Sequence, residues 1–479
     1  MLLPFVRQMP KGGDLHNHAS GAIYAESYIR WATSDGLCVD EKSLALSPAP
    51  CDAGRPELKS ALTRDGGLHD RLVDAWSMRN RAKSPENGHD LFFDTFGKFG
   101  AASRVRGGDV LAEIVSRAAA SNLQYVELML NPDSGGAMQA GRRTGWNDDL
   151  RALRESLLTP ADVPDGAPRG LREVVARSRV WLDESEARKR ALLGCSTARP
   201  DPGCNVAVRY LYQVLRALPP AEVYAQMVFA FELAAADSRA VGVNLVQPED
   251  DPAALANFRL HMRMLDYLHT VYPAVGISLH AGELAPGLVP PEELRFHIRE
   301  SVVTGHATRI GHGVDVMHED DPFGLLRDLA RRNVLVEICL TSNDTILGVR
   351  GRGHPLKTYL RFGVPVALAT DDEGVSRSDI TVEYVRAVED QGLSYRQLKQ
   401  MARASLEHAF VEGRGLWTGP RGTVRVPPCA RSISGSMTRS ASCRTYLEDN
   451  EKARLQMALE EAFADFEATI AREAASGAR

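Results

Sequence analysis

The chain reads Gly13-Asp14-Leu15-His16-Asn17-His18 near its N-terminus, a short apolar run that ends in two histidines one residue apart. Alternate side chains of a β-strand point to the same face, so His16 and His18 would present their imidazoles on one side. A divalent metal could then lie against both rings. Such a metal needs further ligands, and other strands must supply them.

Three later segments carry residue types that suit the same site. Each is a strand-like run followed by His, Glu or Asp: Ser278-Leu279-His280-Ala281-Gly282-Glu283, Arg309-Ile310-Gly311-His312-Gly313 and Leu368-Ala369-Thr370-Asp371-Asp372. A fold that gathers the ends of separate strands would bring these side chains together.

Eight short apolar or β-branched runs are spaced along the chain, and segments of helical periodicity separate most of them. This alternation favours parallel strands joined by helices. We expect helices over residues 206–218, 221–236 and 254–272, where large apolar residues recur every three or four positions. We expect strands over residues 14–18, 123–130, 176–182, 241–246, 276–280, 309–312, 334–338 and 364–369. The pattern predicts an α/β fold, a (β/α)8 TIM-type barrel, whose active site lies at the carboxyl ends of the strands.

Two long stretches exceed a minimal barrel. Residues 33–99 follow the first strand and read as an insertion, and the aromatic cluster Phe92, Phe93 and Phe96 suggests that it caps the pocket. Residues 413–443, rich in Gly, Pro, Arg and Ser, predict a loop, and residues 446–472 have the composition of a terminal helix. We expect residues 1–479 to form one barrel domain with a helical extension over residues 413–479.

Composition excludes several classes of protein. A hydrophobic content of 44% and a charged content of 25% are ordinary for a globular chain of 479 residues. The net charge of −5 and the lack of a Lys/Arg-dense stripe argue against nucleic-acid binding. No run of eighteen apolar residues exists, so we expect no membrane span. No feature of the sequence indicates the oligomeric state.

The seven cysteines form three local pairs, each around a Pro-, Ser- or Gly-rich stretch: Cys38 with Cys51, Cys195 with Cys204, and Cys429 with Cys443. Cys339 stands alone. The pairs are either disulfides of an oxidising compartment or free thiols of a cytoplasmic protein. Residues 1–8 are too short for a signal peptide, so the protein is either cytoplasmic or exported with its signal absent from this chain.

The four motifs together describe a hydrolytic metal site. His16, His18, His280 and Asp371 supply the nitrogen and oxygen ligands of a catalytic zinc ion, which keeps one position open for water. Zinc lowers the pKa of that water from about 15.7 toward about 7. Glu283 follows His280 by three residues, and a carboxyl sheltered near other carboxylates stays protonated and acts as an acid.

Two further residues are candidates for the reaction. His312 would orient the attacking water or hold its charge, and Gly311 and Gly313 would let the backbone approach a substrate closely. Asp372 would point to the other side of the strand from Asp371 and accept a proton from a ring nitrogen of the substrate.

Each motif also has an ordinary structural interpretation. A His-x-His sequence is often a pair of surface or core histidines, and an Asp-Asp pair is often a turn or a helix cap. Coincidence of all four motifs at successive strand ends favours a single site.

In this order and at these separations, the motifs resemble those of the metal-dependent adenosine deaminases of the amidohydrolase superfamily. The quoted residues are Asp14-Leu15-His16-Asn17-His18, His280-Ala281-Gly282-Glu283, Gly311-His312-Gly313 and Thr370-Asp371-Asp372. The opening Met9-Pro10-Lys11-Gly12-Gly13 and the long insertion look closest to the branch of exported bacterial enzymes and adenosine deaminase-related growth factors. That likeness favours a periplasmic or secreted protein.

The resemblance implies a metallo-dependent hydrolase that deaminates adenosine or 2′-deoxyadenosine at C6, giving inosine or 2′-deoxyinosine and ammonia. It implies one Zn²⁺ per chain, held by His16, His18, His280 and Asp371, and a purine nucleoside as the small-molecule partner. Carried over by position, Glu283 protonates N1, His312 assists the water, Asp371 belongs to the catalytic set and Asp372 contacts N7. Gly282 counts among the substrate contacts.

Two departures from the family pattern concern the substrate. Ser20 stands where the family often has an Asp that binds the ribose 5′-hydroxyl, and losing a charged acceptor weakens such a contact by about 1.5–3 kcal/mol. Asn244-Leu245-Val246-Gln247 stands where the family usually reads Asp-Leu-x-Gly, whose glycine amide meets the purine N3. Gln247 could narrow the pocket or replace that contact, and Asn244 belongs to the same substrate-contacting segment.

These departures leave two alternatives open. One keeps the chemistry but changes the substrate to an N6-substituted adenine nucleotide or adenine. The other is a growth-factor-like binding protein on a deaminase scaffold, in which residues 33–99 contact the partner.

Overall fold

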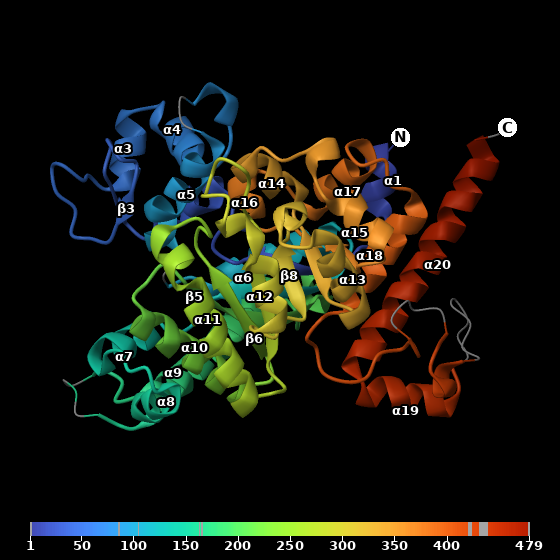
Figure 1. Ribbon diagram of the computed structural model, residues 1–479. Helices are drawn as coiled ribbons and strands as arrows, with labels where there is room; N and C mark the ends of the chain where they lie inside the picture. The colour runs from blue at the N-terminus through green and yellow to red at the C-terminus, as the bar shows by residue number, and fades with distance from the viewer. Residues whose placement is uncertain are drawn as a thin grey trace.

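Eight parallel strands lie side by side in chain order and curve into a barrel (Figure 1). The computed structural model describes residues 2–84, 87–103, 105–161, 163, 166–419, 424–430 and 439–477. The strands are β1 (Gly12–His18), β4 (Leu123–Leu130), β5 (Ala207–Leu215), β6 (Ala240–Val246), β7 (Gly276–Ala281), β8 (Arg309–His312), β9 (Leu335–Ile338) and β10 (Val366–Leu368).

Residues just beyond β10 close the barrel against β1. The backbone N–H of Asp371 donates to the carbonyl of His16 (2.8 Å), and the N–H of His18 donates to the carbonyl of Asp371 (3.1 Å). Asn17 and Asp371 thereby form a parallel bridge. The predicted (β/α)8 TIM-type barrel is confirmed.

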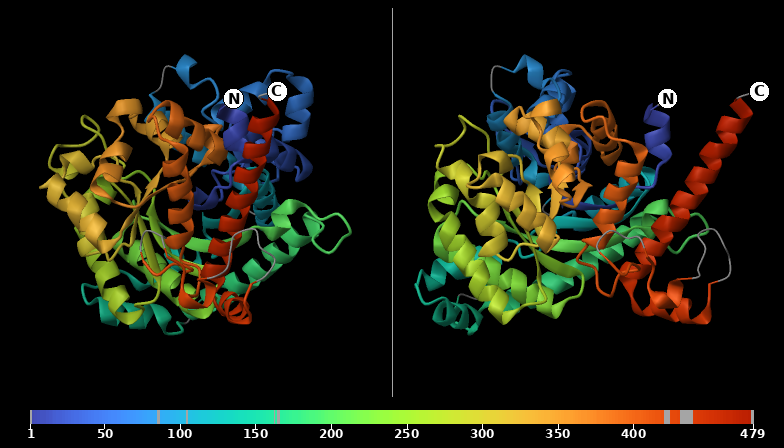
Figure 2. Two further views of the ribbon diagram at one scale, coloured as in Figure 1. Left: turned by 90° about the vertical axis from the view of Figure 1, so that its right-hand side faces the viewer. Right: turned by 45° about the vertical axis from the view of Figure 1, so that its right-hand side comes forward.

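Helices surround the barrel (Figures 1 and 2). Two of the predicted helices are confirmed as α10 (Pro220–Ala236) and α11 (Pro252–Val271). Each starts with a proline in its first turn, where the missing N–H costs nothing. The other helices of the outer ring are α6 (Gly107–Ala120), α12 (His297–Val303), α13 (Pro322–Arg332), α14 (Leu340–Leu347), α15 (Leu356–Phe362), α16 (Glu373–Ser376), α17 (Ile380–Glu389) and α18 (Tyr395–Glu407).

The prediction for the third strand is wrong. Residues 176–182 belong to α9 (Leu171–Leu192), which buries Ser178, Leu182 and Ser185 at helical spacing and exposes Val180. The third strand is β5, in the segment 206–218 that the sequence predicted as a helix. Its apolar residues fit both periodicities. In the structure, residues 208, 210, 212 and 214 are buried, as the alternation of a strand requires.

The insertion after β1 covers the carboxyl end of the barrel. It contains α2 (Ala25–Ser34), β2 (Cys38–Val39), β3 (Leu46–Ser47), α3 (Leu58–Arg64), α4 (Leu68–Ala75) and α5 (Gly88–Phe99). Most of it forms the blue corner of Figure 1. Phe92, Phe93 and Phe96 of α5 line a cavity at the barrel mouth, as expected for a cap. A second excursion, between β4 and β5, holds α7 (Gly136–Thr144), α8 (Leu150–Leu158) and α9.

The C-terminal segment ends in two helices, α19 (Ala441–Asp449) and α20 (Glu451–Gly477), rather than one. The predicted loop over residues 413–443 lies partly outside the described residues. Figure 2 shows α20 running along the barrel toward α1 (Leu2–Gln8). Phe5 of α1 packs edge-on against Phe466 of α20, with ring centroids 5.1 Å apart.

All three local cysteine pairs are disulfides in the structure: Cys38–Cys51, Cys195–Cys204 and Cys429–Cys443. Cys339 is a buried free thiol at the end of β9. Among the described residues, no helix is both long and apolar enough to cross a bilayer.

Candidate active site

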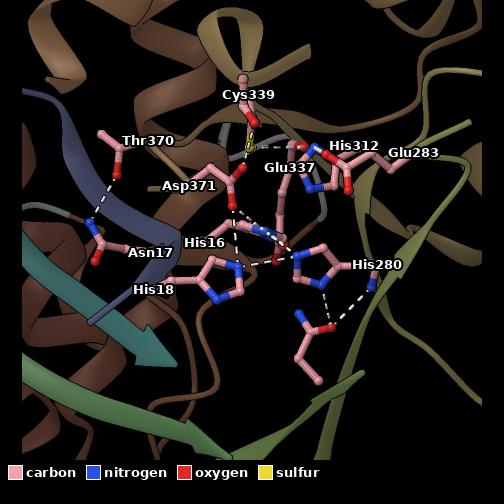
Figure 3. Close-up of polar contacts among 12 residues, drawn as sticks. His16, Asn17, His18, His280, Glu283, His312, Glu337, Cys339, Thr370 and Asp371 are labelled. Carbon is pink, nitrogen blue, oxygen red and sulfur yellow. Dashed lines mark hydrogen bonds and ion pairs between the residues drawn. The ribbon is translucent and has the colours of Figure 1, made fainter. Parts of the chain in front are cut away.

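Four side chains converge at the carboxyl ends of three strands (Figure 3). His16 and His18 come from β1, His280 from β7, and Asp371 from the turn after β10. The Nε2 atom of His280 lies 3.0 Å from that of His16 and 3.2 Å from that of His18. Asp371 Oδ1 lies 3.3 Å and 3.2 Å from the same two Nε2 atoms. The predicted ligand set is therefore brought together in space.

The outer nitrogen of each histidine faces an acceptor. Nδ1 of His16 lies 2.7 Å from Glu337 Oε2, and Nδ1 of His18 lies 2.6 Å from Gln213 Oε1. Nδ1 of His280 lies 2.8 Å from Asn244 Oδ1, which also accepts the His280 backbone N–H at 3.0 Å. With a metal ion bound, each Nδ1 would carry the proton and each Nε2 would turn its lone pair toward the ion.

Three nitrogen lone pairs and a carboxylate oxygen that face one another need a cation between them. Asp371 Oδ1 has no hydrogen-bond partner among the described residues, whereas Ser342 Oγ donates to Oδ2 at 2.6 Å. Histidines whose far nitrogens are held by buried acceptors are typical of metal ligands. The residues therefore fit a zinc ion with one coordination position left for water.

The electrostatics of the site also favour a cation. Burial lowers the pKa of His16, but Asp371 and Glu337 outweigh that effect and raise the pKa to about 10. The pKa of His280 falls well below its ordinary value because the ring is buried beside other histidines. The site attracts positive charge, and His280 keeps its lone pair free.

Backbone geometry aims Asp371 at the histidines. Its φ of 60° lies in the left-handed region, which Asp tolerates better than most residues. This turn lets the Asp371 backbone bond β1 through both its N–H and its carbonyl while the carboxylate points into the barrel mouth.

Glu283 lies beside this set, on the turn after β7. Gly282 makes the turn with a φ of 73°, where a Cβ would lie 2.5 Å from Asp315 Oδ1. The backbone N–H groups of Gly282 and Glu283 both donate to Glu249, at 3.1 and 2.8 Å. Burial and the charges of Asp371 and Glu249 raise the pKa of Glu283 well above its ordinary value. These effects favour the protonated form of Glu283, which can act as an acid.

His312 lies at the end of β8, and its Nδ1 is 3.5 Å from Glu283 Oε1. Burial lowers the pKa of His312 to about 3, so the ring is neutral. Glycine is required on both sides of His312, but not for the predicted close approach of the backbone to a substrate. A Cβ at Gly311 would lie 2.5 Å from His16 Cε1, and one at Gly313 would lie 2.5 Å from the Tyr359 hydroxyl. They make room for protein side chains rather than for a substrate.

Asp372 lines the cavity next to the ligand set. Burial raises its pKa to about 8. A carboxyl with this pKa is mostly protonated at pH 7, so it can donate a hydrogen bond as well as accept one. Gly21 allows this placement, since a Cβ there would lie 1.6 Å from Asp372 Oδ1.

A cavity of about 500 Å³ opens beside these groups. Among the described residues, no lysine or arginine lines it. Phe92, Phe93, Phe96 and Ile346 form an apolar part of the lining, which we call the apolar wall. The lining residues are His18, Ser20, Phe92, Phe93, Phe96, Asn131, Gln213, Leu215, Val246, Gln247, Pro248, His280, Glu283, Ile346, Asp371 and Asp372.

Of the other predicted substrate contacts, Ser20 and Gln247 line this cavity, whereas Asn244 and Gly282 do not. Gln247 has a φ of 81°, so its backbone keeps the left-handed shape natural to a glycine. Its side-chain Oε1 accepts the N–H of Ala217 at 3.0 Å and is held there. Asn244 lies behind His280, and the Gly282 N–H is bonded to Glu249.

Sequence reasoning missed the residues behind the ligands. Glu337 could have been predicted, because a charged residue inside the apolar run 334–338 must face a partner within the barrel. Gln213 could not have been predicted, since its segment was predicted as a helix. Ser342 belongs to none of the recognised motifs and is found only through its contact with Asp371.

A model of the adenosine deaminase family matches residues 72–415 of the chain. An adenosine deaminase of Shewanella loihica is 38% identical over 138 residues, which cover 29% of this chain and 38% of the relative. One of Escherichia coli O139:H28 is 40% identical over 136 residues, which cover 28% and 38%. The matched region thus spans less than two fifths of the length of these curated relatives.

Several solved structures share the barrel. An adenine deaminase from Arthrobacter aurescens superposes with a TM-score of 0.52 at 16% identity, covering 84% of this chain and 94% of that one. An N6-mAMP deaminase from Arabidopsis gives 0.52 at 19% identity, covering 85% and 96%. A zinc-bound amidohydrolase from Burkholderia ambifaria gives 0.50 at 16% identity, covering 86% and 88%. At these identities the likeness concerns the fold alone.

Proposed function

The chain belongs to the adenosine deaminase family, and we propose that it catalyses the zinc-dependent hydrolytic deamination of adenosine and 2′-deoxyadenosine. The products are inosine or 2′-deoxyinosine and ammonia. One observation carries the proposal: a buried set of three histidines and one carboxylate lies beside Glu283, whose pKa is raised well above its ordinary value, at one cavity. A hydrolysis at an aminopurine needs both an activated water and an acid.

His16, His18, His280 and Asp371 would hold one zinc ion. When bound, zinc supplies an activated water by lowering its pKa to about 7. Glu283 donates its proton to the ring nitrogen N1, which draws electrons from C6 as the water adds there. Asp372 donates a hydrogen bond to N7 and fixes the plane of the base. One proton of the water passes to the amino group, which leaves as ammonia, the other returns to Glu283, and the oxygen of the water remains on C6.

The cavity lining favours a nucleoside over a nucleotide. A phosphate group requires Arg, Lys or several N–H donors, and no lysine or arginine lines the described cavity. Phe92, Phe93, Phe96 and Ile346 instead offer an apolar wall. This argues against N6-substituted adenine nucleotides.

Adenine is the second candidate substrate. Ser20 supports it, because a neutral hydroxyl is a weaker acceptor for a ribose 5′-hydroxyl than a carboxylate is. With adenine as the substrate, the same zinc site, Glu283 and Asp372 would act unchanged.

The test is ammonia release from adenosine by protein loaded with one zinc ion per chain. We expect turnover that a chelator abolishes and added zinc restores. No turnover with zinc fully bound would contradict the proposal. A binding protein on a deaminase scaffold would keep its biological effect in a Glu283→Gln variant.

We also propose that the protein acts in an oxidising compartment, as the exported members of the family do. The three disulfides support this, since such bonds are rare in the reducing cytoplasm. Thiol counting under denaturing conditions without reductant should give one free thiol per chain, that of Cys339. A count of three or more would contradict the proposal.

A further inference from the structure

We propose that Asn343 and His354 fix His312 in the tautomer that carries its proton on Nε2. His312 then donates a hydrogen bond to the attacking oxygen and cannot take its proton. The inference rests on the proposed function only in that His312 faces the reacting atoms. Asn343 and His354 line neither the cavity nor the metal set, and no sequence motif drew attention to them.

The three side chains form one hydrogen-bonded chain. The backbone N–H of Leu356 lies 3.2 Å from Nδ1 of His354. Nε2 of His354 lies 3.0 Å from Oδ1 of Asn343, on α14. Nδ2 of Asn343 lies 2.9 Å from Nδ1 of His312. All three side chains are buried.

The direction of each hydrogen bond follows from the first. A backbone N–H can only donate, so Nδ1 of His354 is an acceptor and its Nε2 carries the proton. That proton goes to Oδ1 of Asn343, so the amide presents its NH₂ group to His312. Nδ1 of His312 must then accept, and the ring proton lies on Nε2. The hydrogen-bond partners therefore determine where each proton of the chain lies.

The starting point of the chain is secure because His354 is neutral. Burial, with Arg386 nearby, lowers the pKa of His354 to about 4. A neutral imidazole has one donor and one acceptor, which is what the two neighbours of His354 require.

The other end of the chain is open. Nε2 of His312 is buried and has no hydrogen-bond partner among the described residues. Its ring centroid lies 4.9 Å from that of His16 and 5.1 Å from that of His280, so the free N–H is next to the ligand set (Figure 3). Of the two roles considered for His312, holding charge on the attacking oxygen is the one that a donor can fill.

Asn343→Asp tests the proposal, because a carboxylate has the same shape but only accepts. The proton of His312 should move to Nδ1. We expect kcat to fall about 100-fold, the loss typical of one missing donor to a developing charge, with KM changed less than threefold. His354→Gln keeps a donor for Asn343 and should stay within about threefold of the native kcat, whereas His354→Phe should lose at least tenfold.

A matched control separates the hydrogen-bonded chain from the general effect of a buried histidine. His261 on α11 is fully buried, and neither ring nitrogen has a partner among the described residues. His261→Phe should change thermal stability but not the tautomer of His312.

Nitrogen NMR of ¹⁵N-histidine-labelled, zinc-loaded protein reads the tautomer without turnover, with the His312 signals assigned by their loss in His312→Phe. We expect an unprotonated Nδ1 and a protonated Nε2 in the native protein, and a protonated Nδ1 in Asn343→Asp. A proton on Nδ1 in the native protein would overturn the proposal, as would native kcat in Asn343→Asp once its Nδ1 is protonated. If adenosine is not deaminated but the tautomer is as stated, only the proposed function fails.

Discussion

The metal end of the cavity, formed by His16, His18, His280 and Asp371, differs from the apolar wall in the elements that build it. Three of the four predicted metal ligands lie on barrel strands, and the fourth lies on the bridge that closes the barrel. Nδ1 of each ligand histidine faces a side-chain acceptor, and two of these acceptors, Glu337 and Asn244, are buried. The wall comes from α5 of the insertion, which carries the three phenylalanines, and from Ile346 of α14. From this difference we expect that the barrel determines the reaction and that the added segments help to select the substrate.

Glu283→Gln should have the largest effect, because it removes the proposed acid and leaves both the zinc ligands and the apolar wall unchanged. Glutamine keeps the shape of the side chain but cannot give up a proton to N1, so kcat should fall by about 10³. Zinc content and KM should change little, because neither the ligands nor the wall is altered. Steady-state kinetics with metal analysis measures this, and activity within tenfold of native would remove Glu283 from the acid role.

Asn244→Leu tests whether Asn244 supports the metal ligand His280 or contacts the substrate. The structure has it behind His280, so its loss should weaken zinc binding by about 10–100-fold. At saturating zinc, KM for adenosine should stay native. A raised KM with unchanged zinc affinity would make Asn244 a substrate contact, as the sequence alone suggested. Zinc competition titrations decide between the two.

The pH dependence of KM tests Asp372. Its carboxyl is protonated below its raised pKa of about 8 and loses its proton above that value. A dication at the ligand set lowers this pKa, so KM should begin to rise at or below pH 8 and increase about tenfold per pH unit. Asp372→Asn keeps a donor that does not titrate and should flatten the profile. If KM of Asp372→Asn rose with pH in the same way, another group would be responsible for the pH dependence.

Phe96→Ala should have the smallest effect. An aromatic contact contributes about 0.5–1.5 kcal/mol beyond area burial, so KM should rise about two- to twelvefold. Zinc affinity and the tautomer of His312 should not change. A loss of bound zinc in this variant would show that the apolar wall and the metal end are not independent.

Much of this site could be predicted because strand geometry is written in short sequence patterns. His16 and His18 share a face by alternation, and His280, His312 and Asp371 end runs that read as strands. β5 could not be assigned, because its apolar residues satisfy both a helical and a strand period. Gln213 lies on β5, so its contact with His18 could not be predicted either. The contacts among His312, Asn343 and His354 join the end of β8, the helix α14 and the segment before α15, and no local sequence pattern predicts contacts between such distant segments.

A substrate panel tests the central claim most directly, that the barrel deaminates an uncharged aminopurine nucleoside. The zinc-loaded protein is compared on adenosine, 2′-deoxyadenosine, adenine and N6-methyl-AMP by kcat/KM. Adenosine and 2′-deoxyadenosine should be the best substrates. N6-methyl-AMP should be at least about 100-fold poorer, since an unpaired buried charge costs about 3 kcal/mol or more. A preference for N6-methyl-AMP, or no turnover of any of the four, would contradict the account.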